Sequence, residues 1–217
     1  MAEAVREGNS SLYSFVRVLT ACAFHTVLPV SYHHTDRIPA EPPFVLISNH
    51  VHALDPFLVA YPVRNHQAVF LGKKELAKNR LFRRVLTGLH TILVDRHNTD
   101  MSAMRECMKA LKAGKPLVIF PEGTRHHEGQ MEHIENGASL IIMRSRAPVV
   151  PMYIDRPLKL FRRVSVWVGD PIPYEDLLAR GINAETCEEM NERMRETFRG
   201  LIRDAEAGAG KHPLRKK

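Results

Sequence analysis

The sequence lacks the patterns that would support a disulfide framework, a metal site or a covalent nucleophile. Its three cysteines, Cys22, Cys107 and Cys187, are odd in number, far apart and without the ligand spacing of a zinc site. We expect them to be buried, reduced thiols in a cytosolic compartment. The 12 histidines form no metal-ligand pattern with cysteines or carboxylates, and no G-x-S-x-G nucleophile elbow occurs. No metal is therefore expected.

Long apolar runs are also scarce. No signal peptide is expected, because charged residues lie among the first positions and no small-residue cleavage site follows an apolar core. The apolar segment at residues 11–30 is interrupted by Arg17 and His25, which fall on one narrow stripe of a helix. Three interpretations stay open: an amphipathic helix on a membrane surface, a transmembrane span, or a helix packed on the protein's own core.

The composition is that of a globular protein with an excess of positive charge. The 217 residues fit one domain, and the formal net charge of +7 suits an anionic partner. That partner could be nucleic acid, an acidic membrane surface or a phosphorylated substrate. The basic residues are not interleaved with aromatic ones, and no helix-turn-helix or zinc pattern occurs, so no nucleic-acid partner is expected.

A turn-rich passage at residues 33–43, which contains three prolines, divides the chain. It predicts a helical membrane-associating leader at residues 1–38, a main domain at 39–208 and a basic, disordered tail at 209–217. In the main domain, the patterns predict strands at residues 44–47, 68–71, 91–94, 117–120, 149–154 and 164–168, and helices at 56–61, 81–89, 99–113, 137–146 and 184–205. This alternation predicts an α/β fold with a mixed, largely parallel sheet flanked by helices, whose functional residues collect at the carboxyl ends of strands.

The first candidate site directly follows the predicted strand at residues 44–47. His50 and Asp55 are separated by four residues, and Pro56 suits the first turn of a helix. If a tight loop runs into that helix, the Asp55 carboxylate can fold back on the imidazole and leave the other ring nitrogen to accept a proton. Such a dyad is a general base for an alcohol, and Asp55 can double as the helix N-cap. Alternatively, Asp55 is only a cap and His50 an incidental loop residue.

Basic and hydroxyl side chains follow other predicted strands. The segment Phe-Pro-Glu-Gly-Thr-Arg at residues 120–125 places Thr124, Arg125 and backbone donors where they suit a phosphate clamp. Lys73 follows a second strand and Arg96 a third, which would deepen a positive pocket at the same edge of the sheet. Each of these segments alone also fits a solvated turn or loop.

Together, these segments resemble a known family, the 1-acylglycerol-3-phosphate acyltransferases, in their order and spacing. The resemblance covers about residues 44 to 154. The blocks that carry it are Asn-His-x4-Asp at 49–55, Gly-Lys-Lys-Glu-Leu at 72–76, Val-Asp-Arg at 94–96, Phe-Pro-Glu-Gly-Thr-Arg at 120–125 and Val-Val-Pro-Met at 149–152. The resemblance implies that family's fold for the main domain.

The resemblance also implies roles. His50 would be the catalytic base, and Asp55 would orient it. The glycerol phosphate acceptor would be bound by Lys73, Arg96, Glu122, Gly123, Thr124 and Arg125. The implied reaction moves a fatty acyl group from acyl-CoA or acyl carrier protein to the free hydroxyl of 1-acylglycerol 3-phosphate, giving phosphatidic acid. No cofactor is implied, because the thioester is a co-substrate.

A lysolipid substrate places the site of action at a membrane. The implied partner is a phospholipid surface, and the implied location is the cytoplasmic face of the cell membrane, with the chain held as a peripheral or monotopic protein. The leader helix and the net positive charge would provide the attachment.

Two positions depart from the family pattern. His126 stands where the family commonly has Ser, and Glu135 stands where it often has a basic residue. Glycerol 3-phosphate or another lysolipid is therefore an alternative acceptor. The alternative of another class is a non-catalytic module that binds anionic lipid through the same Lys and Arg residues, and loss of His50 would not impair such a module.

Overall fold

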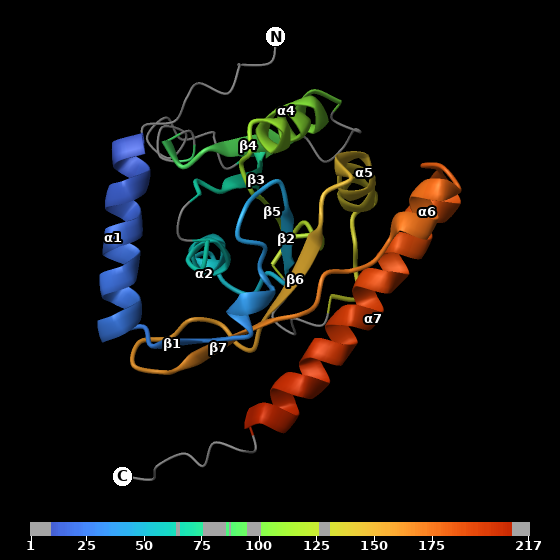
Figure 1. Ribbon diagram of the computed structural model, residues 1–217. Helices are drawn as coiled ribbons and strands as arrows, with labels where there is room; N and C mark the ends of the chain where they lie inside the picture. The colour runs from blue at the N-terminus through green and yellow to red at the C-terminus, as the bar shows by residue number, and fades with distance from the viewer. Residues whose placement is uncertain are drawn as a thin grey trace.

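The protein is built around one mixed sheet (Figure 1). The computed structural model describes residues 10–63, 66–75, 86, 88–94, 101–125 and 131–209. The strands are β1 (Val30–His33), β2 (Val45–Ser48), β3 (Val69–Lys73), β4 (Thr91–Val94), β5 (Leu117–Ile119), β6 (Val149–Ile154) and β7 (Val164–Val168). They are arranged in the order β1-β7-β6-β2-β5-β3-β4. Every neighbouring pair is parallel except β6 and β7, so the predicted mixed, largely parallel sheet is confirmed.

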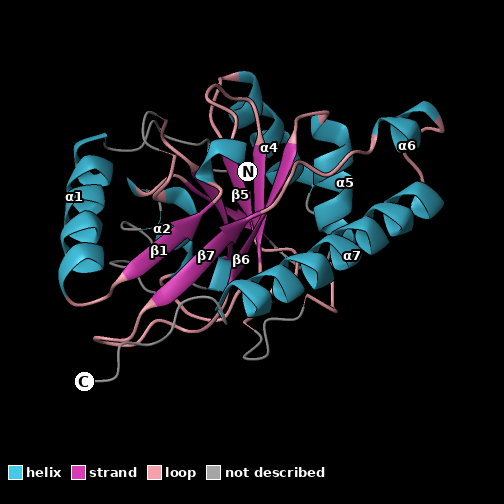
Figure 2. Cartoon of the chain, turned by 60° about the horizontal axis from the view of Figure 1, so that its bottom comes forward, coloured by secondary structure: helices cyan, strands magenta, loops and turns pink. Residues whose placement is uncertain are grey.

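Helices cover both faces of this sheet (Figure 2). The helices are α1 (Ser10–Thr26), α2 (Asp55–Ala60), α4 (Met101–Lys112), α5 (Asn136–Ser145), α6 (Glu175–Ala179) and α7 (Ala184–Ala209), with a short 3-10 turn η1 (Thr35–Arg37). One apolar core lies under α4, α5, α6 and α7, and a second lies on the opposite face under α1 and α2. The central strand β2 is buried along its whole length, as expected of a parallel strand covered on both faces.

The sequence patterns locate most of these elements, and the structure corrects several expectations. β1 and α6 are not predicted from the sequence. β1 belongs to the predicted leader at residues 1–38, yet it pairs with β7, so the leader contributes a strand to the main sheet. Cys107 is buried as expected, but Cys22 is exposed and Cys187 is only half-buried. The predicted helix at 81–89 lies largely outside the described residues, as does the tail from residue 210 onward.

Helix α1 is attached to the core by its inner face. The Ala68 backbone N–H donates to the Tyr13 hydroxyl at 3.2 Å, and Arg17 donates to the Val63 carbonyl at 3.2 Å. Phe24 is buried and meets Tyr61, which directly follows α2, edge-on, with ring centroids 5.4 Å apart. The inner face of α1 is therefore packed on the protein's own core, which was one of the three expected arrangements.

The outer face of α1 remains apolar and exposed. Phe15, Val18 and Leu19 are between 59% and 65% exposed and follow helical spacing along one side. Within the described ranges, no helix is long and apolar enough to cross a membrane. A helix that packs one apolar face on a core while exposing another has a surface available for a partner.

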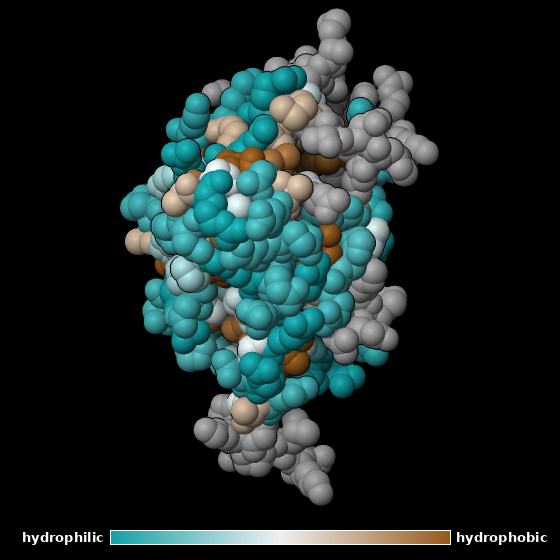
Figure 3. Space-filling model, turned by 90° about the vertical axis from the view of Figure 1, so that its right-hand side faces the viewer, coloured by the Kyte–Doolittle hydropathy of each residue, from teal (hydrophilic) through white to brown (hydrophobic). Residues whose placement is uncertain are grey.

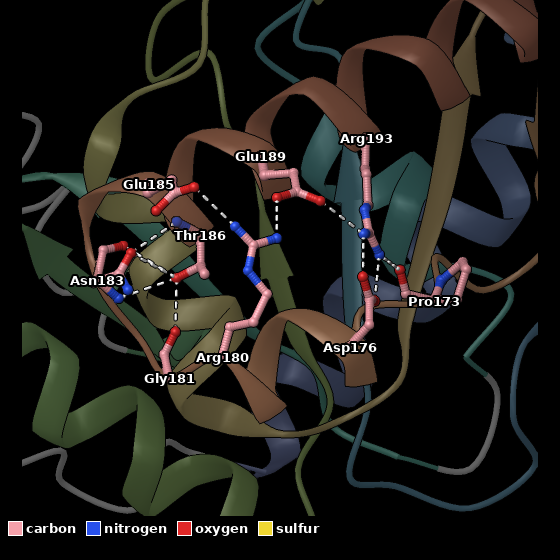
Figure 4. A network of polar contacts seen from close by, with 9 residues as sticks. All are labelled: Pro173, Asp176, Arg180, Gly181, Asn183, Glu185, Thr186, Glu189 and Arg193. Atoms are coloured by element: carbon pink, nitrogen blue, oxygen red, sulfur yellow. Dashed lines mark hydrogen bonds and ion pairs between the residues drawn. The ribbon is translucent and has the colours of Figure 1, made fainter.

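Helix α7 presents a charged outer surface, and this side of the molecule is largely hydrophilic (Figure 3). Arg193 of α7 bonds Asp176 of α6 and Glu189 one turn away, while Arg180 bonds Glu185 and Glu189 (Figure 4). The Arg193 hydrogen bond, helped by the charge of its guanidinium, lowers the pKa of Asp176 from 3.8 to about 2. These ion pairs fix α6 against α7.

Candidate active site

The loop that follows β2 is anchored by a buried amide. Asn49 is inaccessible to solvent, and its Nδ2 donates to the Ile154 carbonyl at 2.9 Å. Its Oδ1 accepts the Ile154 backbone N–H at 2.8 Å. Asn49 therefore satisfies both backbone groups of the last residue of β6 and ties the loop to the carboxyl end of that strand.

His50 and Asp55 form the predicted pair. The His50 Nδ1 atom lies 2.9 Å from Asp55 Oδ2, and the Asp55 side chain is fully buried. The same Oδ2 accepts the backbone N–H groups of Val51 at 2.7 Å and His52 at 2.6 Å. Three donors thus converge on one carboxylate oxygen, which fixes the carboxylate and makes Nδ1 the protonated nitrogen of a neutral His50 ring.

The expected second role of Asp55, as the N-cap of α2, is not observed. The helix begins at Asp55 itself, Leu54 occupies the cap position, and no side chain caps it. The carboxylate points back to the amides of Val51 and His52 instead of forward into the helix. The interpretation of Asp55 as a cap alone is therefore wrong, and its contacts organise the loop that carries His50.

The turn after β5 supports this loop from the side. Glu122 is 1% exposed, and its Oε2 accepts the His50 backbone N–H at 3.0 Å. Gly123 adopts a left-handed backbone conformation with φ of 68°, which a residue without Cβ adopts at little cost. The His50 ring also lies over Phe120, with ring centroids 4.4 Å apart. Backbone, ring and carboxylate partners therefore hold His50 in one orientation.

This geometry suits general base catalysis. With Nδ1 bonded to Asp55, Nε2 is the nitrogen that can take a proton from a substrate hydroxyl. The His50 side chain keeps 19% of its surface exposed, whereas Asp55 keeps none. Among the described residues, no three His, Cys, Asp or Glu side chains gather closely enough to hold a metal ion.

The predicted acceptor-binding residues that the structure describes lie at the same edge of the sheet as His50. This edge is formed by the carboxyl ends of the parallel strands β2, β5 and β3. Lys73 ends β3, and Gly123, Thr124 and Arg125 follow β5, which lies between β3 and β2. Arg125 is exposed and Thr124 is half-buried. Arg96, which follows β4, lies outside the described residues, as does His126.

A separate cavity of about 260 Å³ lies away from this chemistry, between α7 and the last residues of β1 and β7. It is lined by His34, Trp167 and Asp204 among others. Because β7 runs antiparallel to β6 and parallel to β1, this cavity is at the opposite edge of the sheet from His50.

Two contacts of the site are not predicted from the sequence. Asn49 belongs to the Asn-His-x4-Asp box, but its bonds to Ile154 join positions 105 residues apart. The Glu122 bond to the His50 amide spans 72 residues. The sequence does show that the segments of Asn49 and Glu122 each follow a buried strand of one parallel sheet. This predicts that both residues lie at the same edge of the sheet, but not which residue each of them contacts.

Comparison with known proteins gives one consistent result. The acyltransferase family model matches residues 29–155. A 1-acyl-sn-glycerol-3-phosphate acyltransferase of Streptococcus pneumoniae is 28% identical over 203 residues, which cover 90% of this chain and 75% of that protein. The corresponding protein of Bacillus subtilis is 29% identical, covering 77% and 87%. The human alpha enzyme of the same name is 31% identical, covering 81% and 65%.

The fold is also similar to a solved structure. The crystal structure of the 1-acyl-sn-glycerophosphate (LPA) acyltransferase PlsC from Thermotoga maritima matches with a TM-score of 0.66. The match covers 93% of this chain and 80% of that one, at 21% sequence identity. At this identity, the match concerns the arrangement of the sheet and helices.

Proposed function

Because the chain belongs to the acyltransferase family, we propose that it transfers a fatty acyl group from a thioester to the free hydroxyl of 1-acylglycerol 3-phosphate, giving phosphatidic acid. The names of the relatives from Streptococcus pneumoniae, Bacillus subtilis and human support this acceptor. The observation that carries the chemistry is the 2.9 Å contact between His50 Nδ1 and the buried Asp55 carboxylate. The donor is acyl-CoA or acyl carrier protein.

The proposed transfer is direct. His50 Nε2 removes the proton of the acceptor hydroxyl while that oxygen attacks the thioester carbonyl carbon. Asp55 stabilises the imidazolium that forms, because its carboxylate is held 2.9 Å from Nδ1. The tetrahedral intermediate then collapses, the carbon–sulfur bond breaks, and the leaving thiolate takes the proton from His50. Backbone N–H groups beside the turn after β5 are the proposed donors to the oxyanion. The mechanism uses no metal and no cofactor.

For the acceptor phosphate, we assign binding to Lys73, Gly123, Thr124 and Arg125 at this edge. We also assign it to Arg96, which lies outside the described residues. We assign Glu122 a different role from the one that its motif implied. Its carboxylate is buried and accepts the His50 amide, so it supports the catalytic loop. A carboxylate would also repel a phosphate at close range, which argues against direct contact with the acceptor.

The proposed site of action is the cytoplasmic face of the cell membrane, where the chain is held as a peripheral protein by the outer face of α1. The supporting observation is the exposure of Phe15, Val18 and Leu19. Removal of residues 1–35 would not test this cleanly, because it would also remove β1 from the sheet. Replacement of Phe15 and Leu19 by Ser leaves the sheet intact. It should weaken flotation with anionic vesicles, whereas unchanged flotation would remove α1 from the account.

The acceptor is tested by a panel of alcohols offered to the purified chain with one acyl-CoA. We expect the highest kcat/KM with 1-acylglycerol 3-phosphate, and a much lower value with 1-acylglycerol, which lacks the phosphate. Glycerol 3-phosphate tests the alternative that Glu135 leaves open. If the phosphate-free acceptor reacted equally well, the proposed phosphate site would be wrong. If no acceptor reacted with either acyl-CoA or acyl-loaded acyl carrier protein as the donor, the alternative of a non-catalytic lipid-binding module would be favoured.

A further inference from the structure

The turn that joins β6 to β7, residues 155–163, exposes two large apolar side chains that the proposed chemistry does not use. Leu160 is 67% exposed and Phe161 is 77% exposed, the highest values among the large apolar side chains of the described residues. Leu158 in the same turn is buried, at 6%. The turn therefore has its own anchor in the core and still presents two neighbouring apolar side chains to its surroundings.

The backbone holds these two side chains outward. Lys159 and Arg162 form an isolated antiparallel bridge, with Leu160 and Phe161 at the tip between them. Phe161 has a φ of 58°, a left-handed conformation that bulky side chains rarely adopt. Its N–H donates to the Val27 carbonyl at 2.7 Å, just beyond the end of α1. An unfavourable backbone conformation that exposes an aromatic ring points to a function for that ring.

The surroundings of the tip are basic. Residues 155–163 contain four basic side chains and one acidic side chain, Asp155. Asp155 is paired with Arg156 at 2.8 Å, so its charge is already compensated. Lys159 and Arg162, which flank the two apolar residues, are exposed. Apolar side chains flanked by exposed cations are complementary to an anionic lipid leaflet, with its negative headgroups above its acyl chains.

The turn lies at the same edge of the sheet as the catalytic pair. β6 runs parallel to β2, so the carboxyl end of β6, from which the turn departs, lies beside the loop that carries His50. The two Asn49–Ile154 hydrogen bonds join that loop directly to the last residue of β6. Figure 1 also places the β6–β7 connection beside the end of α1 that leads into β1, which agrees with the Phe161–Val27 bond.

We propose that the β6–β7 turn is a second membrane contact. In this arrangement, Leu160 and Phe161 insert among the acyl chains of an anionic leaflet, and Lys159 and Arg162 lie at the level of the lipid phosphates. Together with α1, the turn sets the orientation of the protein so that the His50 edge faces the leaflet from which a lysolipid would come. This inference extends the membrane part of the proposed function and does not depend on acyl transfer.

The test is flotation of the full chain with phosphatidylcholine vesicles, with or without phosphatidylglycerol. Replacement of Leu160 and Phe161 by Ser should weaken partitioning onto phosphatidylglycerol vesicles by about tenfold, because their apolar area no longer leaves water. Replacement of Lys159 and Arg162 by Gln should weaken it by about fivefold per charge, and only where phosphatidylglycerol is present. Both pairs are exposed, so circular dichroism and the melting temperature should be unchanged.

Matched control residues lie on the face of the sheet that α4 and α7 cover, opposite α1. Met101 and Ile182, which are 44% and 37% exposed, are replaced by Ser, and the exposed cations Lys112 and Arg203 are replaced by Gln. Neither control should reduce flotation. Equal losses in a control and its test pair would overturn the proposal, as would wild-type flotation of the Leu160 and Phe161 variant. A change in that variant's oligomeric state with unchanged flotation would also overturn it, in favour of contact between chains.

Flotation without substrate separates this inference from the proposed catalysis. The His50→Ala chain should float like the wild type, because the turn does not require the base. Conversely, the Leu160 and Phe161 variant should keep its rate with a short-chain, water-soluble lysolipid and lose rate with lysolipid embedded in phosphatidylglycerol vesicles. Equal losses with both substrates would contradict a role in membrane contact alone.

Discussion

Replacement of Asp55 by Asn removes the charge of the catalytic pair and retains most of its hydrogen bonds. Asp55 Oδ2 accepts three donors, namely His50 Nδ1 at 2.9 Å, Val51 N at 2.7 Å and His52 N at 2.6 Å. The two backbone donors keep the Asn side-chain oxygen in the position of Oδ2. The loop should therefore stay folded, and the main loss is the attraction between the carboxylate and the imidazolium.

That attraction sets the expected magnitude. Two unit charges about 4 Å apart attract by about 4 kcal/mol at an effective dielectric constant near 20. If this attraction exists only once His50 has taken the proton, its loss lowers kcat by about 10³-fold, since each 1.36 kcal/mol is tenfold in rate. The KM for the acceptor should change little, because Asp55 is fully buried and does not touch the substrate.

The assay is steady-state formation of phosphatidic acid from an acyl-CoA and 1-acylglycerol 3-phosphate, with circular dichroism and the melting temperature measured in parallel. Asp170→Asn is the matched control, since Asp170 is 79% exposed and pairs with Arg37 at the opposite edge of the sheet. Asp55→Ala should lose both activity and stability, because two backbone N–H groups lose their acceptor. A folded Asp55→Asn protein with a kcat close to that of the wild type would show that the Asp55 charge does not stabilise the transition state.

Three further predictions concern the contacts that hold the site and the fold. Glu122→Ala should lower the free energy of unfolding by about 1–3 kcal/mol in urea titrations, because a buried amide of the catalytic loop loses its acceptor. Glu122→Gln should restore most of this free energy. Equal stability of the two variants would contradict the role of Glu122 as the acceptor of that amide. Asn49→Ala should lower the melting temperature by about 2–4 °C for each kcal/mol of free energy of unfolding that is lost, because both backbone groups of Ile154 lose their partner. An unchanged melting temperature would show that the Asn49–Ile154 hydrogen bonds do not stabilise the fold. The pKa of Asp176 is lowered from 3.8 to about 2 by Arg193, so this pair stabilises the fold above the unfolded pKa and its contribution is lost as the pH falls from 3.8 toward 2. The urea midpoint should therefore fall less over this pH interval in Arg193→Met than in the wild type, and parallel curves would exclude the contribution.

The sequence predicts the central strands of the fold well, because their pattern is local. β6 spans Val149–Ile154, the range that the apolar run predicts, and each predicted strand is present within one or two residues. β1 has no such signal. All four of its residues are half-buried, and among the strands that the structure describes it pairs only with β7, more than 130 residues away in the chain. An edge strand of mixed composition depends on tertiary pairing, which no local pattern contains.

The same difference between local and long-range contacts decides which parts of the site the sequence predicts. His50 and Asp55 are close in the chain, so a single loop suffices to bring them together, and their spacing predicts the pair. The sequence gives no indication that Asp55 would also accept two loop amides, since that depends on loop conformation. The contact of Glu122 with the His50 amide needs the β2–β5 pairing, and Glu122 in an acceptor-binding motif suggested a different role.

His50 is the proposed base of an acyl transfer to a phosphate-bearing alcohol. The most direct measurement compares phosphatidic acid formation by the wild type, His50→Ala and His52→Ala, all with acyl-CoA and 1-acylglycerol 3-phosphate. His52 lies in the same loop and contributes its backbone amide to Asp55, which alanine preserves. We expect His50→Ala to lose about 10²–10⁴-fold in kcat, whereas His52→Ala should keep most of the wild-type kcat. A His50→Ala protein that still forms phosphatidic acid at a rate close to that of the wild type would contradict this role of His50.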